Sequence, residues 1–128
     1  MKYGYTREVA HPFDRAVERV TDELGKEGFG VLTTIDVKDT LKKKLDEDRP
    51  PYVILGACNP NFAHQALAME EDLGLLLPCN AVVYENEQGR IVVGAIDAHA
   101  MLGVVENEDL NPVADEVNTR LRRAIDAV

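Results

Sequence analysis

The sequence predicts one α+β domain over residues 1–128, with a mostly antiparallel sheet of about five strands and long helices packed on one face. Two observations predict this class. The long amphipathic patterns, at residues 12–27 and 111–127, lie near the ends of the chain, and the strand patterns concentrate between them. The last two strand patterns are joined by a polar turn at residues 86–89, which is typical of a β-hairpin. A doubly wound parallel sheet is the alternative, and it is disfavoured because no glycine-rich phosphate loop follows the first strand pattern.

The first part of the chain alternates strand and helix patterns. Residues 3–10 suit a first strand, and Pro12 then opens a helix at the position where its missing N–H costs nothing. Apolar residues recur in this helix at three- and four-residue spacing, namely Phe13, Ala16, Val17, Val20 and Leu24. Residues 29–37 are rich in β-branched side chains and predict a second strand. Asp39 is expected to cap a short helix that runs through Leu45.

The middle of the chain carries its most apolar strand pattern. Residues 52–57 form an uninterrupted apolar run, which predicts a third strand buried on both faces. Asn59 followed by Pro60 predicts the start of a helix, because asparagine is a good cap and proline suits the first helical position. This helix is expected to end near residues 73–74.

The last part of the chain predicts the hairpin and a terminal helix. Residues 75–85 and 90–97 predict the fourth and fifth strands. Residues 98–108 show a less regular pattern, to which we assign no element. Asp109 or Asn111 is expected to cap the last helix.

Composition and charge exclude several classes of protein. Of the 128 residues, 45% are hydrophobic, so the chain can bury a core, and a largely disordered protein is excluded. No stretch approaches the roughly 20 apolar residues of a membrane helix, and the beginning lacks the apolar core of a signal peptide. The net charge of −9 disfavours nucleic acids and anionic membranes as partners. We therefore expect an acidic cytoplasmic protein that binds neither.

Both cysteines lie in near-matching corners, residues 56–60 (Gly-Ala-Cys-Asn-Pro) and 77–80 (Leu-Pro-Cys-Asn). If the third and fourth strands are antiparallel neighbours, the end of one lies beside the start of the other. Seven polar or thiol residues would then gather at that end of the sheet: Cys58, Asn59, His64, Cys79, Asn80, Asp97 and His99. A parallel crossover would instead separate the two cysteines by roughly 15 Å or more.

Three interpretations of the cysteines stay open. Isolated buried cysteines are common small hydrophobes, so both thiols suit the core alone. A helix amino terminus lowers the pKa of a nearby thiol, which makes Cys58 a candidate nucleophile or redox thiol. Two thiols with one or two imidazoles also suit a soft metal such as zinc, although the separation of 21 positions matches no compact zinc motif. The asparagines, His64 and Asp97 have plainer roles as caps, an exposed polar side chain and a strand end.

Five segments of the chain together form a distinctive pattern: residues 27–32 (Glu-Gly-Phe-Gly-Val-Leu), 35–36 (Ile-Asp), 54–60 (Ile-Leu-Gly-Ala-Cys-Asn-Pro), 63–67 (Ala-His-Gln-Ala-Leu) and 74–80 (Gly-Leu-Leu-Leu-Pro-Cys-Asn). In these segments the chain resembles a prokaryotic family known as domain of unknown function 302. The resemblance implies a curved antiparallel sheet in a small α+β protein, with a fold similar to the TATA-binding-protein-like class. It implies no activity, and the charge of the chain argues against binding to DNA.

The function predicted from these observations is the binding of a small ligand in a pocket at the corner of Cys58 and Cys79. A helix amino terminus, two thiols and amide side chains make a polar lip for such a pocket, while no complete acid–base or nucleophile–base set is evident. A thiol-dependent redox or metal-binding protein is the first alternative, and a structural or interaction protein is the second. We assign no catalytic residue, metal site or cofactor. Strands that are apolar on both faces, with long helices available for only one, further predict a homodimer.

Overall fold

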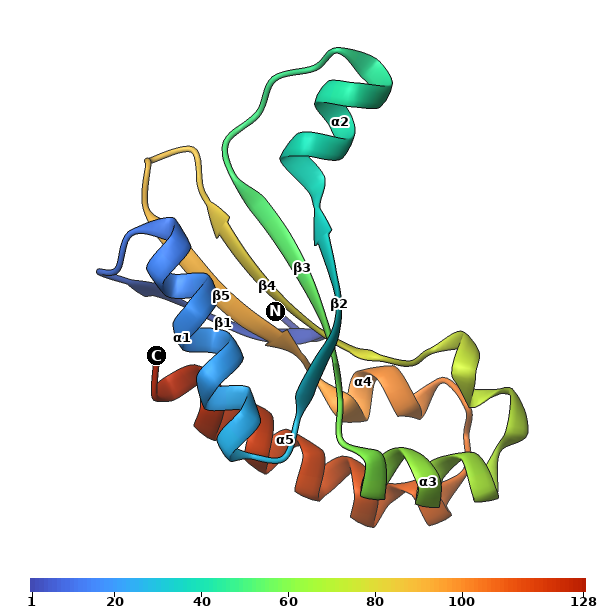
Figure 1. Ribbon diagram of the computed structural model, residues 1–128. Coiled ribbons are helices and arrows are strands. Elements are labelled where there is room, and N and C mark those ends of the chain that lie inside the picture. The colour runs from blue at the N-terminus through green and yellow to red at the C-terminus, as the bar shows by residue number, and fades with distance from the viewer.

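The computed structural model describes residues 1–128 and contains a five-stranded sheet with the order β1-β5-β4-β3-β2 (Figure 1). The strands are β1 (Gly4–Val9), β2 (Gly30–Asp36), β3 (Tyr52–Cys58), β4 (Cys79–Glu85) and β5 (Ile91–Ile96). The helices are α1 (Phe13–Lys26), α2 (Val37–Leu45), α3 (Pro60–Met69), α4 (Ala98–Gly103) and α5 (Asn111–Asp126), with two 3₁₀ turns, η1 (Glu71–Leu75) and η2 (Glu108–Leu110). All neighbouring strands are antiparallel, which confirms the predicted α+β class.

The core lies between the sheet and the two long helices, α1 and α5, which cover one face (Figure 1). Val83 of β4 and Val93 of β5 are directly opposite each other and fully buried on this face. Leu24 of α1 and Leu121 of α5 belong to the same buried cluster. Burial of each such side chain stabilises the fold by about 1.5–3 kcal/mol. None of the helices is long and apolar enough to span a membrane.

The opposite face of the sheet, here called the open face, carries apolar side chains that are only partly buried. The strand register places Tyr52 opposite Tyr84, and their rings stack with centroids 5.1 Å apart. Ile54 lies opposite Val82 in the same two strands, and both are partly exposed. The long helices therefore bury one face and leave an apolar face uncovered, as the sequence predicts.

The helix that follows β2 is capped by a different residue from the expected one. The Asp39 N–H donates to Oδ1 of Asp36 at 2.9 Å, so Asp36 is the cap and Asp39 already lies in the first turn of α2. Asp36 has the extended backbone that a cap needs, because it is the last residue of β2. Either of two aspartates three positions apart could cap this helix as far as the sequence shows. The residue at which β2 ends determines which of them does so.

The segment between α3 and β4 also differs from the expectation. α3 ends at Met69, the 3₁₀ turn η1 follows, and β4 begins only at Cys79. The peptide bond between Leu77 and Pro78 is cis. The apolar residues 75–78 therefore belong to the end of η1 and to the connection that follows it, and not to the strand. This connection forms one side of the corner described below.

Two shorter differences concern the end of the chain. Residues 98–103 form the helix α4, because Oδ1 of Asp97 accepts a hydrogen bond from the Ala100 N–H at 3.0 Å and caps it. α5 has no side-chain cap, since Asn107 instead caps the turn η2 that leads into it. The expected caps, Asp109 and Asn111, are thus both wrong.

Candidate functional site

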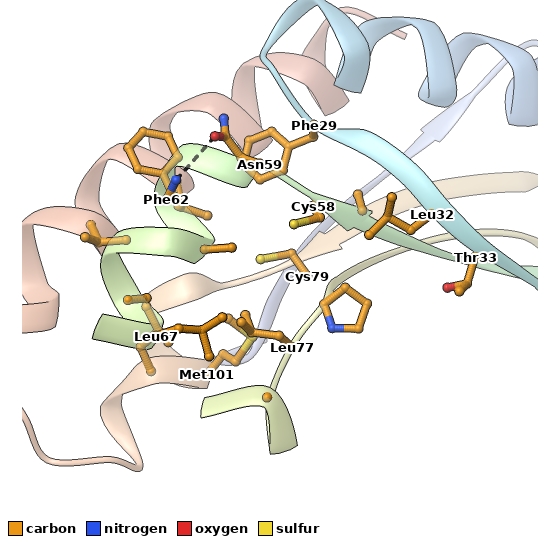
Figure 2. Close-up of a pocket in the computed structure, with 18 residues that line it drawn as sticks. Phe29, Leu32, Thr33, Cys58, Asn59, Phe62, Leu67, Leu77, Cys79 and Met101 are labelled. Carbon is orange, nitrogen blue, oxygen red and sulfur yellow. Dashed lines mark hydrogen bonds between the residues drawn. The ribbon is translucent and has the colours of Figure 1, made fainter. Parts of the chain in front are cut away.

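The two cysteines meet at one end of the sheet, where β3 ends and β4 begins. Ala57 lies directly opposite Cys79 in the antiparallel pair, and Cys58 is the next residue along β3. Both sulfurs are free thiols. Figure 2 shows both pointing into the same pocket. The corner predicted from the antiparallel order therefore exists.

The pocket at this corner has a volume of about 360 Å³ and is bounded by six parts of the chain. These are the first half of β2, the end of β3, helix α3, the connection before β4, helix α4 and helix α5 (Figure 2). Its apolar lining includes Phe29, Leu32, Phe62, Ala63, Ala66, Leu67, Leu77, Met101, Leu102, Val113 and Val117. The polar or thiol lining is Thr33, Cys58, Asn59 and Cys79. No charged side chain lines the pocket.

The side chain of Asn59 forms hydrogen bonds that link the segments of the corner. Its Oδ1 accepts from the Phe62 N–H at 3.4 Å and so caps α3, and its Nδ2 donates to the Glu27 carbonyl at 3.5 Å. The same carbonyl accepts from Arg120 of α5 at 3.2 Å. Gly28 packs against this amide with φ +85°, and a Cβ there would lie 2.8 Å from Nδ2 of Asn59. The amide of Asn59 is therefore used by the protein itself.

The thiols differ in burial, and the burial of Cys79 changes its pKa. Cys79 is 8% exposed, whereas Cys58 is partly exposed. Burial, with a smaller contribution from the neighbouring Cys58, raises the pKa of Cys79 to about 11. Its thiol is therefore protonated at neutral pH, because removal from water disfavours the thiolate.

Four of the seven residues predicted at this corner, His64, Asn80, Asp97 and His99, do not line the pocket. His64 is exposed on α3 and is absent from the pocket lining. Asn80 is exposed on the open face, where it borders a separate hollow of about 230 Å³. Asp97 caps α4, and its carboxylate lies 3.7 Å from Arg122. The structure thus brings together Cys58, Asn59 and Cys79 only.

His99 and the acidic residues near the corner form no cation-binding cluster. The ring Nε2 of His99 lies 2.6 Å from Asp115 of α5, outside the pocket. Burial alone would raise the pKa of Asp97, but hydrogen bonds from Ala100, Asn118 and His99, together with Arg122, lower it. No group of three or more histidine, cysteine, aspartate or glutamate side chains is placed to hold a metal ion.

The apolar walls are the part of the site that the sequence analysis missed. They come from elements far apart in the chain, such as Met101 in α4 and Val117 in α5. One feature of the sequence pointed to an apolar wall in α3. This helix contains no charged residue, although part of it is exposed. Leu67 in this helix is 39% exposed, and Leu32 across the mouth is 69% exposed.

Comparison with known proteins places this fold in a family. A family model described as "Domain of unknown function DUF302" matches residues 5–128. The crystal structure of an uncharacterized conserved DUF302 protein from Bacillus stearothermophilus is similar, with a TM-score of 0.92 and 31% sequence identity. The match covers 99% of this chain and 98% of that chain. A search of curated proteins found no match. The chain therefore belongs to the DUF302 family, a description that names a domain and no activity.

Proposed function

We propose that the protein binds a small, uncharged, largely apolar molecule in the pocket at the corner of Cys58 and Cys79. The observation that carries this proposal is the lining, which is apolar on all sides and includes no charged side chain. The volume of about 360 Å³ lies within the range of ligand pockets in proteins. A charged ligand would lose its hydration there without gaining a partner, so the pocket selects against it.

The polar groups of the pocket favour the same class of ligand. The amide of Asn59 already caps α3 and bonds to Glu27, which leaves the Thr33 hydroxyl and the two thiols to meet a ligand. Thiols are weak hydrogen-bond partners and behave as small hydrophobes. The exposed Leu32 and Leu67 at the mouth would be covered by a bound apolar molecule, which adds to the driving force.

A thiol-dependent redox protein is the second candidate. It is favoured by the two neighbouring thiols that share one pocket. The raised pKa of Cys79 weighs against it, because the thiolate is the reactive form in thiol chemistry. No acid–base pair reaches the pocket to activate either sulfur, so we assign no catalytic residue.

Two variants of α3 test the location of the proposed binding. Ala63 lines the pocket, whereas Ala68, in the same helix, is exposed and does not. We expect Ala63→Phe to weaken the binding of a neutral, polarity-sensitive naphthalene fluorophore by roughly tenfold or more, because the ring occupies the space of the probe. Ala68→Phe should leave the affinity unchanged. Equal affinity in both variants would show that the probe binds elsewhere and would contradict the proposal.

Native mass spectrometry of freshly purified protein is the complementary test. It detects a small molecule retained from the cell without a guess at its identity. We expect an uncharged organic molecule on the wild type that is reduced in Ala63→Phe. A retained molecule of equal abundance in that variant would place its site outside the pocket.

A second copy of the chain is the proposed partner, and it would cover the open face. This face is apolar around Tyr52, Ile54, Val82 and Tyr84, its Glu8 is paired with Arg90 at 3.1 Å, and Arg49 lies over the Tyr52 ring at its edge. Two molecules of net charge −9 repel each other over most of their surface, so an apolar face without unpaired acidic residues is where two copies can meet. The two neighbouring thiols, unjoined, suit a reducing compartment such as the cytoplasm.

Light scattering at micromolar concentration tests the dimer. We expect a dimer mass for the wild type and a monomer mass for Val82→Asp, which places a charge in the middle of the open face. Glu87→Ala, in the exposed hairpin turn, serves as the control and should remain dimeric. A monomer mass for the wild type would remove the proposal of a homodimer.

A further inference from the structure

The two thiols lie at neighbouring positions of β3 and β4 and line the same pocket. Cα atoms that lie directly opposite each other in an antiparallel pair are about 4.5–5.5 Å apart. Because Cys58 is one residue beyond Ala57, the partner of Cys79, the two cysteine Cα atoms are roughly 6 Å apart. The nearby Cys58 also contributes to the raised pKa of Cys79, after the larger effect of burial. Figure 2 shows both sulfurs directed into the pocket and not away from each other.

Two neighbouring thiols can bind either a metal ion or a trivalent arsenic atom. The apolar, uncharged surroundings of these thiols favour one of the two. A monovalent metal ion held by two thiolates carries a net negative charge, and the pocket has no cation to balance it. A trivalent arsenic centre with an organic substituent gives a neutral product when it bonds to two sulfurs. Its substituent can occupy the remaining apolar volume, which no inorganic ion would fill.

We propose that Cys58 and Cys79 together capture a trivalent organic arsenical, R–As(OH)₂, with its apolar R group seated among the side chains of α3 and α5. In this step two As–O bonds break and two As–S bonds form. Each thiol proton leaves with one hydroxyl group as water, so two waters are released and no atom changes its oxidation state. The inference rests on the proposed function, because it places the R group in the same apolar pocket.

Phenylarsine oxide, which hydrates to such a compound, is the probe. We expect one phenylarsenical per chain by mass spectrometry and the simultaneous loss of both free thiols in a count with a thiol reagent. Excess monothiol should leave the adduct in place, whereas a small dithiol should remove it, because two linked bonds must be replaced together. Cys58→Ala and Cys79→Ala should each weaken the capture by roughly 100-fold or more.

Substitutions in α3 test whether the apolar walls of the pocket contribute to binding of the arsenical. Ala63→Phe should weaken binding of phenylarsine oxide but not of inorganic arsenite, which has no apolar substituent to seat. Ala68→Phe should change neither. The wild-type thiol count and the monothiol challenge need no substitution, so they remain decisive if a cysteine variant fails to fold.

Different outcomes separate this inference from the proposed function. No reaction of the folded wild type, two arsenicals per chain, or an adduct removed by monothiol would each overturn the inference. Binding of the naphthalene fluorophore in the pocket together with any of these results would leave the proposed function intact. If neither the fluorophore nor the arsenical binds in the pocket, both proposals fail.

Discussion

The dipeptide Cys-Asn occurs twice in this chain, and the two copies have different roles although they lie side by side. Asn59 is buried, caps α3 and bonds to the backbone at Glu27. Asn80 is exposed on the open face, opposite Gly56. The two cysteines show the opposite order of burial. Cys79, in the corner with the exposed asparagine, is the more buried of the two. The difference arises from position, since Cys58 ends a strand and Cys79 begins one.

This comparison shows how a strand end changes the use of a residue. At the end of β3 the chain leaves the sheet and turns into α3, so Asn59 meets the unpaired N–H groups of a helix start. At the beginning of β4 the chain continues in the sheet, so Asn80 follows the alternation and faces away from Cys79. Both thiols nevertheless reach one pocket, because the two corners are antiparallel neighbours.

The largest expected difference between the corners is in alkaline stability. The folded-state pKa of Cys79, raised from 9.0 to about 11, contributes stability that is fully present below the lower value and lost as the pH rises through the higher one. The loss attributable to Cys79 is on the order of 2–3 kcal/mol. Urea unfolding at a series of pH values measures it.

The two single-cysteine variants supply the comparison for this titration. Cys79→Ala should lack this part of the alkaline loss, while Cys58→Ala should retain most of it. Equal slopes against pH in the two variants would contradict the difference in burial.

The asparagines should differ by a smaller amount. Asn59→Ala removes the cap of α3 and a partner of the Glu27 carbonyl, so we expect its free energy of unfolding to fall by about 1–2 kcal/mol. Asn80→Ala changes an exposed side chain and should cost less than about 0.5 kcal/mol. Asn59→Ser, which keeps a capping oxygen, should recover part of the loss. A larger loss in Asn80→Ala would reverse the comparison.

His64 should have the smallest effect on the site. Its side chain is exposed on α3 and does not line the pocket. We expect His64→Ala to change the affinity for the naphthalene fluorophore by less than about twofold, within the effect of an exposed substitution. Fluorescence titration beside Ala63→Phe measures it, and a loss as large as that of Ala63→Phe would mean that His64 belongs to the site.

The antiparallel sheet and its terminal hairpin could be predicted because neighbouring signals agree. The hairpin turn fixes β4 against β5, and the long helices near the ends of the chain leave the strands to pair among themselves. The caps were less predictable, since Asp36 and Asp39 are both suitable and the end of β2 decides between them. α4 was missed because it is short, and its main signal is the cap at Asp97.

The site was predictable in part. The position of both thiols follows from antiparallel pairing, which the sequence analysis favoured. The placement of His64 is explained by helix geometry, because it lies two residues, or about 200°, from the buried Ala66. The apolar walls were out of reach, since Met101 and Val117 approach the corner only through the packing of α4 and α5.

The most direct test of the central claim, that both thiols open into one apolar pocket, is the rate at which a neutral thiol reagent labels the folded protein. Cys58→Ala and Cys79→Ala each leave one thiol to follow. We expect both thiols to react without unfolding, Cys58 to react faster than Cys79, and saturating naphthalene fluorophore to slow both reactions. Labelling that requires unfolding, or protection of neither thiol by the bound fluorophore, would contradict this claim.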